Sequence, residues 1–318
     1  MDFLWVDLIF LVLAIYFFSY RGNTMHLRSV ELQMPNRQEA VDFLKSPWGL
    51  VEVDTRGATT YLRGSDNFHY ALSITEGAEK LVKSATLIGT MDEVKASFER
   101  VKAAGLKHSA WVAQFDEPGH GAGFTFGGLD GEPFRVICEK DPQPAALVSD
   151  GTHPLRVAHV VFNTKQREAA SKLLIDVLGL KVTDRTKVMN FLRCDDLHHV
   201  VAYADSEHST LNHIAFEMQD MDTMFSGMGR MKDNGFETVW GPGRHGPGNN
   251  AFAYFIGPFG ACIEFTSEIE RVDDSYVTGT PDDWKWPPKR TDHWGIAVRD
   301  DSKLMASSQT FHYESIAA

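Results

Sequence analysis

Cysteine and basic residues are both scarce in this chain of 318 residues. The three cysteines, Cys138, Cys194 and Cys262, are an odd number without CxxC spacing, which excludes a small disulfide-stabilised scaffold. We expect free thiols in a reducing compartment, the cytoplasm. Lys and Arg total 31 against 43 Asp and Glu, which gives a net charge of −12, and the basic residues form no cluster in the sequence. Because such a chain repels a phosphate backbone, no nucleic-acid partner is expected.

Glycine motifs that bind phosphate are also missing. No GxxxxGK[ST] motif occurs and no GxGxxG opens a helix, so HGPGNN at residues 245–250 is interpreted as a turn. With 43% apolar and 23% charged residues, the chain has ample material for a core, and its length allows roughly two domains. A disordered or collagen-like chain is thereby excluded.

An apolar run at residues 3–20 carries a single charge, Asp7. A bilayer crossing needs about 20 apolar residues, so this run is marginal, and it lacks the basic start and small-residue cleavage site of a signal peptide. Two interpretations stay open: a short membrane anchor, or an extension upstream of a start at Met25. In both, residues 1–24 lie outside the functional domains, and a membrane partner is expected only in the first.

The rest of the chain contains an internal repeat. Shifted by 130 residues, the sequence aligns with itself at many identical positions without a gap. These positions include Leu44 and Leu174, Gly49 and Gly179, Asp54 and Asp184, Arg63 and Arg193, His69 and His199, and Met91 and Met221. So long a period indicates two duplicated domains rather than a solenoid. We predict a first domain at 25–140, a linker at 141–154, a second domain at 155–270 and a C-terminal extension at 271–318.

Each copy is predicted to contain two βαβββ modules. In the second copy a strand pattern at 156–163 precedes a helical pattern at 166–178 that stops at Gly179. The second module begins with a strand at 211–218 and a helix at 221–234. In both modules, short strand-like runs occur where the three later strands are expected. The fold class is therefore α+β, with two tandem domains of paired βαβββ modules.

Two histidines and one glutamate occupy equivalent strands in the second copy. His159 lies on the first strand of the first module, His213 on the first strand of the second module, and Glu264 on its last strand. If the sheet curls, two neutral imidazoles and one carboxylate converge, and they leave positions on a non-haem Fe(II) free for an organic substrate and O₂. Spacing alone leaves a second interpretation open, that the three are hydrogen-bonded core residues.

The first copy lacks this set of side chains. Ser29 or Glu31 is opposite His159, Lys83 is opposite His213, and Ile137 is opposite Glu264. We therefore expect a metal site in the second domain and a first domain that is not catalytic.

Four longer motifs occur in the second copy. They are LHHVVAY at 197–203, LNHIAFEM at 211–218, GRHGPGNNAFAYF at 243–255 and IGPFGACIEFTSE at 256–268. In these motifs the chain resembles the type I extradiol ring-cleavage dioxygenases of the vicinal oxygen chelate superfamily, which include the catechol 2,3-dioxygenases. The resemblance extends over roughly residues 25–274. The GRHGPGNN stretch and the WPP sequence at 286–288 are similar to those of the trihydroxytoluene oxygenase branch.

The resemblance implies a vicinal oxygen chelate fold and gives each site residue a role. The two histidines and the glutamate identified above would be Fe(II) ligands. His199 would be the acid/base imidazole beside the iron, and His245 and Tyr254 would hydrogen-bond the substrate oxygens. Arg244 and Asn249 are further candidate substrate contacts, with Arg244 either pairing with a substrate carboxylate or facing solvent.

The implied activity is cleavage of a catecholic ring next to its hydroxyl pair, with insertion of both atoms of O₂. Candidate substrates are catechol, dihydroxybiphenyl, dihydroxycumate and trihydroxytoluene, and the family implies a homo-oligomer. Two alternatives stay open. One is a glyoxalase-like metal-dependent isomerase, which would normally need a fourth protein ligand, and the other is a non-catalytic ligand-binding protein of the same fold.

Overall fold

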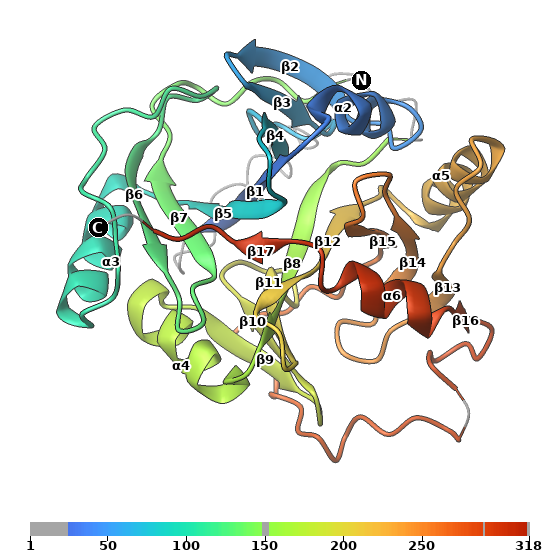
Figure 1. Cartoon of the computed structure of the whole chain (residues 1–318). Helices are drawn as coiled ribbons and strands as arrows, with labels where there is room; N and C mark the ends of the chain where they lie inside the picture. The colour runs from blue at the N-terminus through green and yellow to red at the C-terminus, as the bar shows by residue number, and fades with distance from the viewer. Residues whose placement is uncertain (1–24, 148–152, 289, 317–318) are drawn as a thin grey trace, which may run out of the picture.

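The computed structural model describes residues 25–147, 153–288 and 290–316 (Figure 1). The apolar run at 3–20 and part of the predicted linker lie outside these residues. Among the helices that are described, none combines the length and the apolar character needed to cross a bilayer. The three cysteines are free thiols, as the sequence predicts.

The predicted α+β order is confirmed in both copies. The first copy consists of β1 (His26–Met34), α2 (Arg37–Lys45), β2 (Val51–Arg56), β3 (Thr59–Arg63) and β4 (Leu72–Glu76), then β5 (Leu81–Ile88), α3 (Met91–Ala103), β6 (Ala122–Gly127) and β7 (Pro133–Cys138). In its second module, isolated bridges at His108 and Val112 stand where a regular third strand was expected.

The second copy contains both complete modules. They are β8 (Arg156–Thr164), α4 (Arg167–Leu178), β9 (Lys181–Arg185), β10 (Met189–Arg193) and β11 (Val201–Asp205), then β12 (Thr210–Glu217), α5 (Met221–Asp233), β13 (Trp240–Arg244), β14 (Ala251–Ile256) and β15 (Cys262–Ser267). The extension adds β16 (Val298–Arg299), α6 (Asp301–Ser307) and β17 (His312–Tyr313).

Local sequence signals explain where the helices begin and end. Thr90 and Glu93 form a reciprocal capping box at the start of α3, and Asp220 and Thr223 form another at the start of α5. Helix α4 ends at Gly179, whose φ of 75° is the left-handed conformation that glycine adopts without a steric penalty. The predicted stop at Gly179 is therefore confirmed.

Strand pairing places three strands of the second copy side by side. Strand β8 pairs in parallel with β11 and antiparallel with β12, and β12 pairs in parallel with β15. The resulting order across this copy is β9-β10-β11-β8-β12-β15-β14-β13. Side chains on one face of β8, β12 and β15 are consequently close neighbours.

The two copies share a core. Trp48, which follows α2 in the first copy, stacks on Phe265 of β15, with ring centroids 3.8 Å apart and an interplanar angle of 13°. It also meets Phe216 and Phe255 edge-on, and it is fully buried. Strand β17 pairs with β12 of one copy and β5 of the other, and Figure 1 shows it as the red strand between them. The copies are therefore packed on each other.

The pairing registers revise the comparison of the two copies. His159 lies opposite Ala215, which in turn pairs with Glu264. In the first copy, Ser29 lies opposite Thr86, which pairs with Arg135. Ser29 is thus the counterpart of His159, as one of the two predicted options had it, but Arg135 rather than Ile137 replaces Glu264.

The residue of the first copy that corresponds to His213 also differs from the one expected from the sequence. His213 lies opposite Val161, and the matching pair in the first copy is Ser84 with Glu31, so the expectation of Lys83 was wrong by one position. The reason is that the connection between β10 and β11 is one residue shorter than that between β3 and β4. A constant offset therefore fails from β4 through β5.

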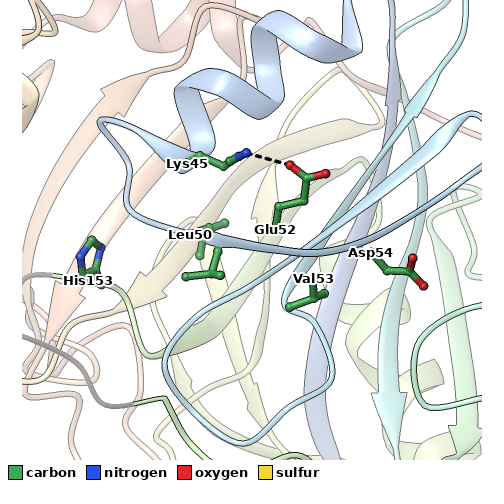
Figure 2. Close-up of a pocket in the computed structure, with 7 residues that line it drawn as sticks. Lys45, Leu50, Glu52, Val53, Asp54 and His153 are labelled. Atoms are coloured by element: carbon green, nitrogen blue, oxygen red, sulfur yellow. Dashed lines mark hydrogen bonds and ion pairs between the residues drawn. The ribbon is translucent and has the colours of Figure 1, made fainter.

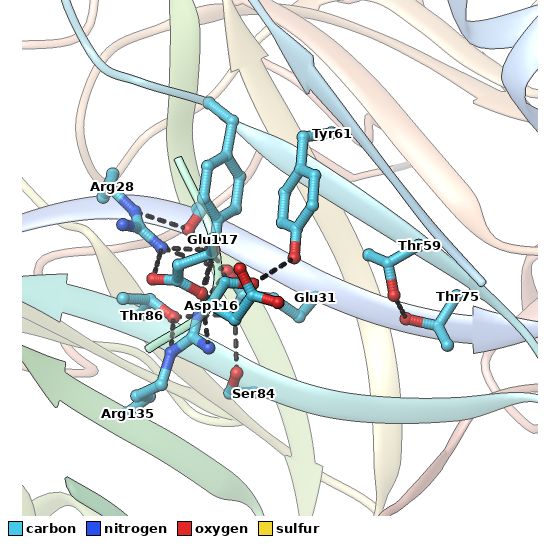
Figure 3. A network of polar contacts seen from close by, with 12 residues as sticks. Arg28, Glu31, Thr59, Tyr61, Thr75, Ser84, Thr86, Asp116, Glu117 and Arg135 are labelled. Carbon is cyan, nitrogen blue, oxygen red and sulfur yellow. Dashed lines mark hydrogen bonds and ion pairs between the residues drawn. The ribbon is translucent and has the colours of Figure 1, made fainter. Parts of the chain in front are cut away.

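A buried charge network fills the first copy where the second has its two histidines and glutamate (Figure 3). Arg135 contacts Glu31 at 3.0 Å and Glu117 at 2.8 Å, and Arg28 contacts Glu117 at 3.1 Å. Tyr70 donates a hydrogen bond of 2.8 Å to Glu117. Burial alone would raise the pKa of Glu117, but the facing guanidinium groups lower it. The charged groups of the network therefore neutralise one another.

We predict that Arg135→Met destabilises the protein by about 3–5 kcal/mol, because it leaves the two buried carboxylates of Glu31 and Glu117 with only Arg28 as a counter-charge. Urea unfolding of the full chain measures this change. Lys45→Met is the control, since it removes a 2.8 Å ion pair with Glu52 that lies at the surface (Figure 2), and it should cost less than about 1 kcal/mol. Equal losses in the two variants would contradict the structural importance of the network.

Candidate functional site

The structure brings His159, His213 and Glu264 together on the face shared by β8, β12 and β15. Glu264 Oε2 lies 3.2 Å from His159 Nε2 and 3.2 Å from His213 Nε2, and the two Nε2 atoms are 3.4 Å apart. The three residues are buried, with exposed fractions of 2%, 6% and 0%. They form a group of potential metal ligands within the described residues.

The geometry of these atoms fits a divalent cation. Ligand atoms about 2.1 Å from a metal and at right angles to each other lie about 3.0 Å apart, close to the separations found here. Glu264 Oε2 is fully buried and has no hydrogen-bond partner, although such a carboxylate oxygen is costly to leave unpaired. A cation held by the two imidazoles and this oxygen would remove that cost.

Opposite charge partly compensates the burial of the carboxylate. Burial would raise the pKa of Glu264, but the facing imidazoles of His159 and His213, each 3.2 Å from Oε2, hold it well below its usual range. Burial has the largest effect on His213 and lowers its pKa. Ionised carboxylate and neutral imidazole are the forms that bind metals.

His199 lies directly beside this cluster. Its ring is 4.2 Å from the ring of His159 and 5.0 Å from that of Phe191, measured between centroids. Burial, followed by the proximity of the other imidazoles, lowers the pKa of His199 well below its usual value. The Nδ1 of the preceding residue, His198, lies 3.0 Å from Nδ1 of His199.

His245 and Tyr254 lie on the other side of Glu264. His245 Nε2 is 3.0 Å from the Tyr254 hydroxyl and 3.9 Å from Glu264 Oε1. Aromatic neighbours hold both rings, because His245 stacks on Phe252 at 3.9 Å and Tyr254 stacks on Trp240 at 4.9 Å. Burial lowers the pKa of His245 to about 4 and raises that of Tyr254 well above 10.

Two residues named from the sequence lie away from the cluster. Arg244 pairs with Glu268 at 2.5 Å, donates to the backbone oxygen of Asn249 at 2.6 Å, and lies over the ring of Trp294. Asn249 itself is exposed at a turn with a φ of 44°. The contacts of Arg244 are therefore with the turn, Glu268 and Trp294, and not with the cluster.

Sequence reasoning missed Asn250, the second asparagine of the same stretch. Asn250 is fully buried, and its Nδ2 donates to Thr266 at 2.7 Å and reaches Glu264 Oε1 at 3.5 Å. The available signal was its place immediately before β14, the strand that pairs with β15.

Comparisons with known proteins define the family. Residues 156–265 match the model of the Glyoxalase/Bleomycin resistance protein/Dioxygenase superfamily. A crystal structure of the Mn(II)-bound glyoxalase from Novosphingobium aromaticivorans is similar, with a TM-score of 0.80 and 30% identity over 87% of this chain and 93% of that one. The chain belongs to this superfamily, which confirms the predicted fold and family resemblance.

Two curated proteins are also related in sequence. Metapyrocatechase 2 of Cupriavidus necator is 30% identical over 122 residues, which are 37% of this chain and only 38% of that protein. The manganese-dependent 2,3-dihydroxybiphenyl 1,2-dioxygenase of Geobacillus genomosp. 3 is 25% identical over 81% of this chain and 87% of that protein. Homoprotocatechuate 2,3-dioxygenase from Arthrobacter globiformis has the same fold, with a TM-score of 0.78, 19% identity, and coverage of 91% and 94%.

We predict that Gly248→Ala disturbs the two neighbouring histidines. Gly248 has a φ of 76°, and an added Cβ would lie 3.1 Å from His198 Nδ1 and 3.2 Å from His199 Cε1. The left-handed backbone alone should cost about 1–2 kcal/mol. Urea unfolding measures the loss, and imidazole NMR resonances of both histidines should shift.

Gly229→Ala is the matched control for this prediction. Gly229 is exposed on α5, and an added Cβ would meet nothing within 4 Å. This variant should gain about 0.5–1 kcal/mol from the higher helix propensity of alanine. Unchanged imidazole resonances in Gly248→Ala would show that the turn does not press on the histidines.

Proposed function

We propose that the chain is an extradiol dioxygenase. It would cleave an aromatic ring next to a pair of adjacent hydroxyl groups and insert both atoms of O₂, which gives an open-chain product with two new carbonyl groups. The observation that carries this proposal is the grouping of His199, His245 and Tyr254 around a buried set of two imidazoles and a carboxylate. The activities named for the two curated relatives support it.

The proposed cofactor is a divalent metal held by His159, His213 and Glu264, and Fe(II) is the expected ion. The two relatives described as manganese-dependent and Mn(II)-bound support a divalent metal without distinguishing the two ions. When bound, the metal supplies adjacent coordination sites for both substrate oxygens and O₂ and a path for electrons between them.

The surrounding residues would bind and orient the substrate and transfer protons. Because burial lowers its pKa, His199 is neutral and can accept the proton of a substrate hydroxyl at a ring nitrogen. Tyr254 stays protonated, since burial raises its pKa, and its hydroxyl can donate to developing negative charge on a substrate oxygen. His245 hydrogen-bonds Tyr254 and would fix its direction.

The contacts of Arg244 narrow the substrate class. Its guanidinium is engaged by Glu268 and by the backbone of Asn249, so a substrate carboxylate would have to displace these partners. Catechols without a carboxylate, such as catechol, dihydroxybiphenyl and trihydroxytoluene, are therefore favoured over dihydroxycumate. We also propose that the protein forms a homo-oligomer and is located in the cytoplasm.

A glyoxalase-like isomerase is the second candidate. The similar structure described as a glyoxalase favours it. The potential ligand group found in the described residues has three members, whereas the isomerase would normally need a fourth protein ligand. Such an enzyme consumes no O₂, so oxygen uptake separates the two candidates, and a non-catalytic binding protein of this fold would turn over neither type of substrate.

We predict that Glu264→Ala loses the metal. The wild type should bind about one Fe(II) or Mn(II) per chain in anaerobic equilibrium dialysis, and the variant should bind at least about 10-fold more weakly because one of three ligands is gone. Glu268→Ala is the control, because it removes a carboxylate of the same segment that pairs with Arg244 and should leave metal binding unchanged. Full metal retention in Glu264→Ala would remove this residue from the ligand set.

We predict that the Fe(II)-loaded protein consumes one O₂ per catecholic substrate cleaved, with the absorbance of a ring-opened product. Oxygen uptake with catechol, 3-methylcatechol, 2,3-dihydroxybiphenyl and 2,4,5-trihydroxytoluene measures this. His199→Phe should keep the metal and slow turnover by about 10²–10⁴-fold, the usual scale of acid/base catalysis. Metal-loaded wild type that consumes no O₂ with any of these substrates would argue for the isomerase or a binding protein.

A further inference from the structure

A chain of buried hydrogen bonds links His199 to strand β9. His199 Nδ1 lies 3.0 Å from His198 Nδ1, and His198 Nε2 lies 2.7 Å from Asp184 Oδ2. All three residues are buried, with exposed fractions of 3%, 0% and 0%. Asp184 lies on β9, and nothing in the function described above uses it.

The C-terminal extension holds Asp184 in place. The backbone N–H of Gly279 donates to Asp184 Oδ1 at 2.7 Å, and the Tyr276 hydroxyl donates to Oδ2 at 3.2 Å. Since a backbone N–H can only donate, the orientation of the carboxylate is fixed, with Oδ2 turned towards His198.

We propose that Asp184 is a positioning residue that sets, through His198, which nitrogen of His199 carries the proton. This inference rests on the proposed role of His199 in the dioxygenase reaction. An ionised carboxylate only accepts hydrogen bonds, so His198 must present Nε2–H to Asp184. The Nδ1 of neutral His198 then has only a lone pair, which accepts from Nδ1–H of His199. The Nε2 of His199 is left with its lone pair, the form needed to take a proton from the substrate.

The consequence of Asp184→Asn follows from the same contacts. The amide oxygen must stay at the N–H of Gly279, so the NH₂ group replaces Oδ2 and faces His198 Nε2. His198 then carries its proton on Nδ1 and donates it to Nδ1 of His199, which forces the proton of His199 onto Nε2. The tautomers of both histidines are therefore reversed with almost no change in side-chain volume.

Two-dimensional ¹H–¹⁵N spectra of the histidine rings in the metal-free, full-length protein test this. In the wild type, His198 should be the Nε2–H tautomer and His199 the Nδ1–H tautomer, and Asp184→Asn should exchange them. In the metal-loaded enzyme the same variant should lower kcat by about 10²–10⁴-fold, with metal content and KM unchanged.

Asp195→Asn is the matched control. Asp195 is also a buried carboxylate that accepts a backbone N–H, from Leu197, and contacts a histidine, His26, at 3.1 Å, but within the described part of the chain no side-chain hydrogen bond joins it to His198 or His199. It should alter neither the tautomer of His199 nor kcat.

The outcomes separate the two proposals. Unchanged ring spectra in Asp184→Asn, or a doubly protonated His198 in the wild type, would overturn the positioning role even if the enzyme is a dioxygenase. A fall in kcat without a tautomer change would also overturn it and assign Asp184 a purely structural role. If the tautomers exchange but the wild type consumes no O₂, the positioning role stands and the proposed function fails.

Discussion

The neutralisation of charge inside a curled sheet is the constraint on which this structure depends. Glu264 is fully buried, and a carboxylate in such surroundings is stable only with a positive partner. In the second copy two imidazoles face it and one of its oxygens lacks a hydrogen bond, so a cation is the partner that fits. In the first copy Arg135 takes the equivalent position and supplies the positive charge itself. The same strand arrangement therefore produces a potential metal site in one copy and an internal ion-pair network in the other.

Neutral imidazoles and aromatic rings surround Glu264 in the second copy, as the proposed aromatic substrate would require. Burial keeps His199 and His245 neutral, so they can exchange protons or hydrogen bonds without bringing further charge into the site. Stacked rings hold Tyr254 and His245 in one direction, which reduces the entropy lost when a substrate binds. Aromatic rings with a few polar atoms among them are typical of sites for small planar ligands.

Much of this site was predictable from the sequence, because its key residues lie on strands of a repeated module. Strand order suggested that His159, His213 and Glu264 converge but left a core role open, and the structure places their ligand atoms 3.2 to 3.4 Å apart. The counterparts in the first copy could not be found with a constant offset, since the connection between β10 and β11 is one residue shorter than that between β3 and β4. The contacts of Arg244 were equally unpredictable, because they depend on how a turn packs on Glu268 and Trp294.

The C-terminal extension is the part whose role depends most on three-dimensional structure. Tyr276 and Gly279 of this extension contact Asp184, which reaches His199 through His198. An extension that orients a buried carboxylate beside the site can affect proton transfer without touching the substrate. Because its hydrogen bonds to Asp184 are local and directional, small changes there would alter the tautomer of His199 while the proposed metal ligands, on other strands, stay in place.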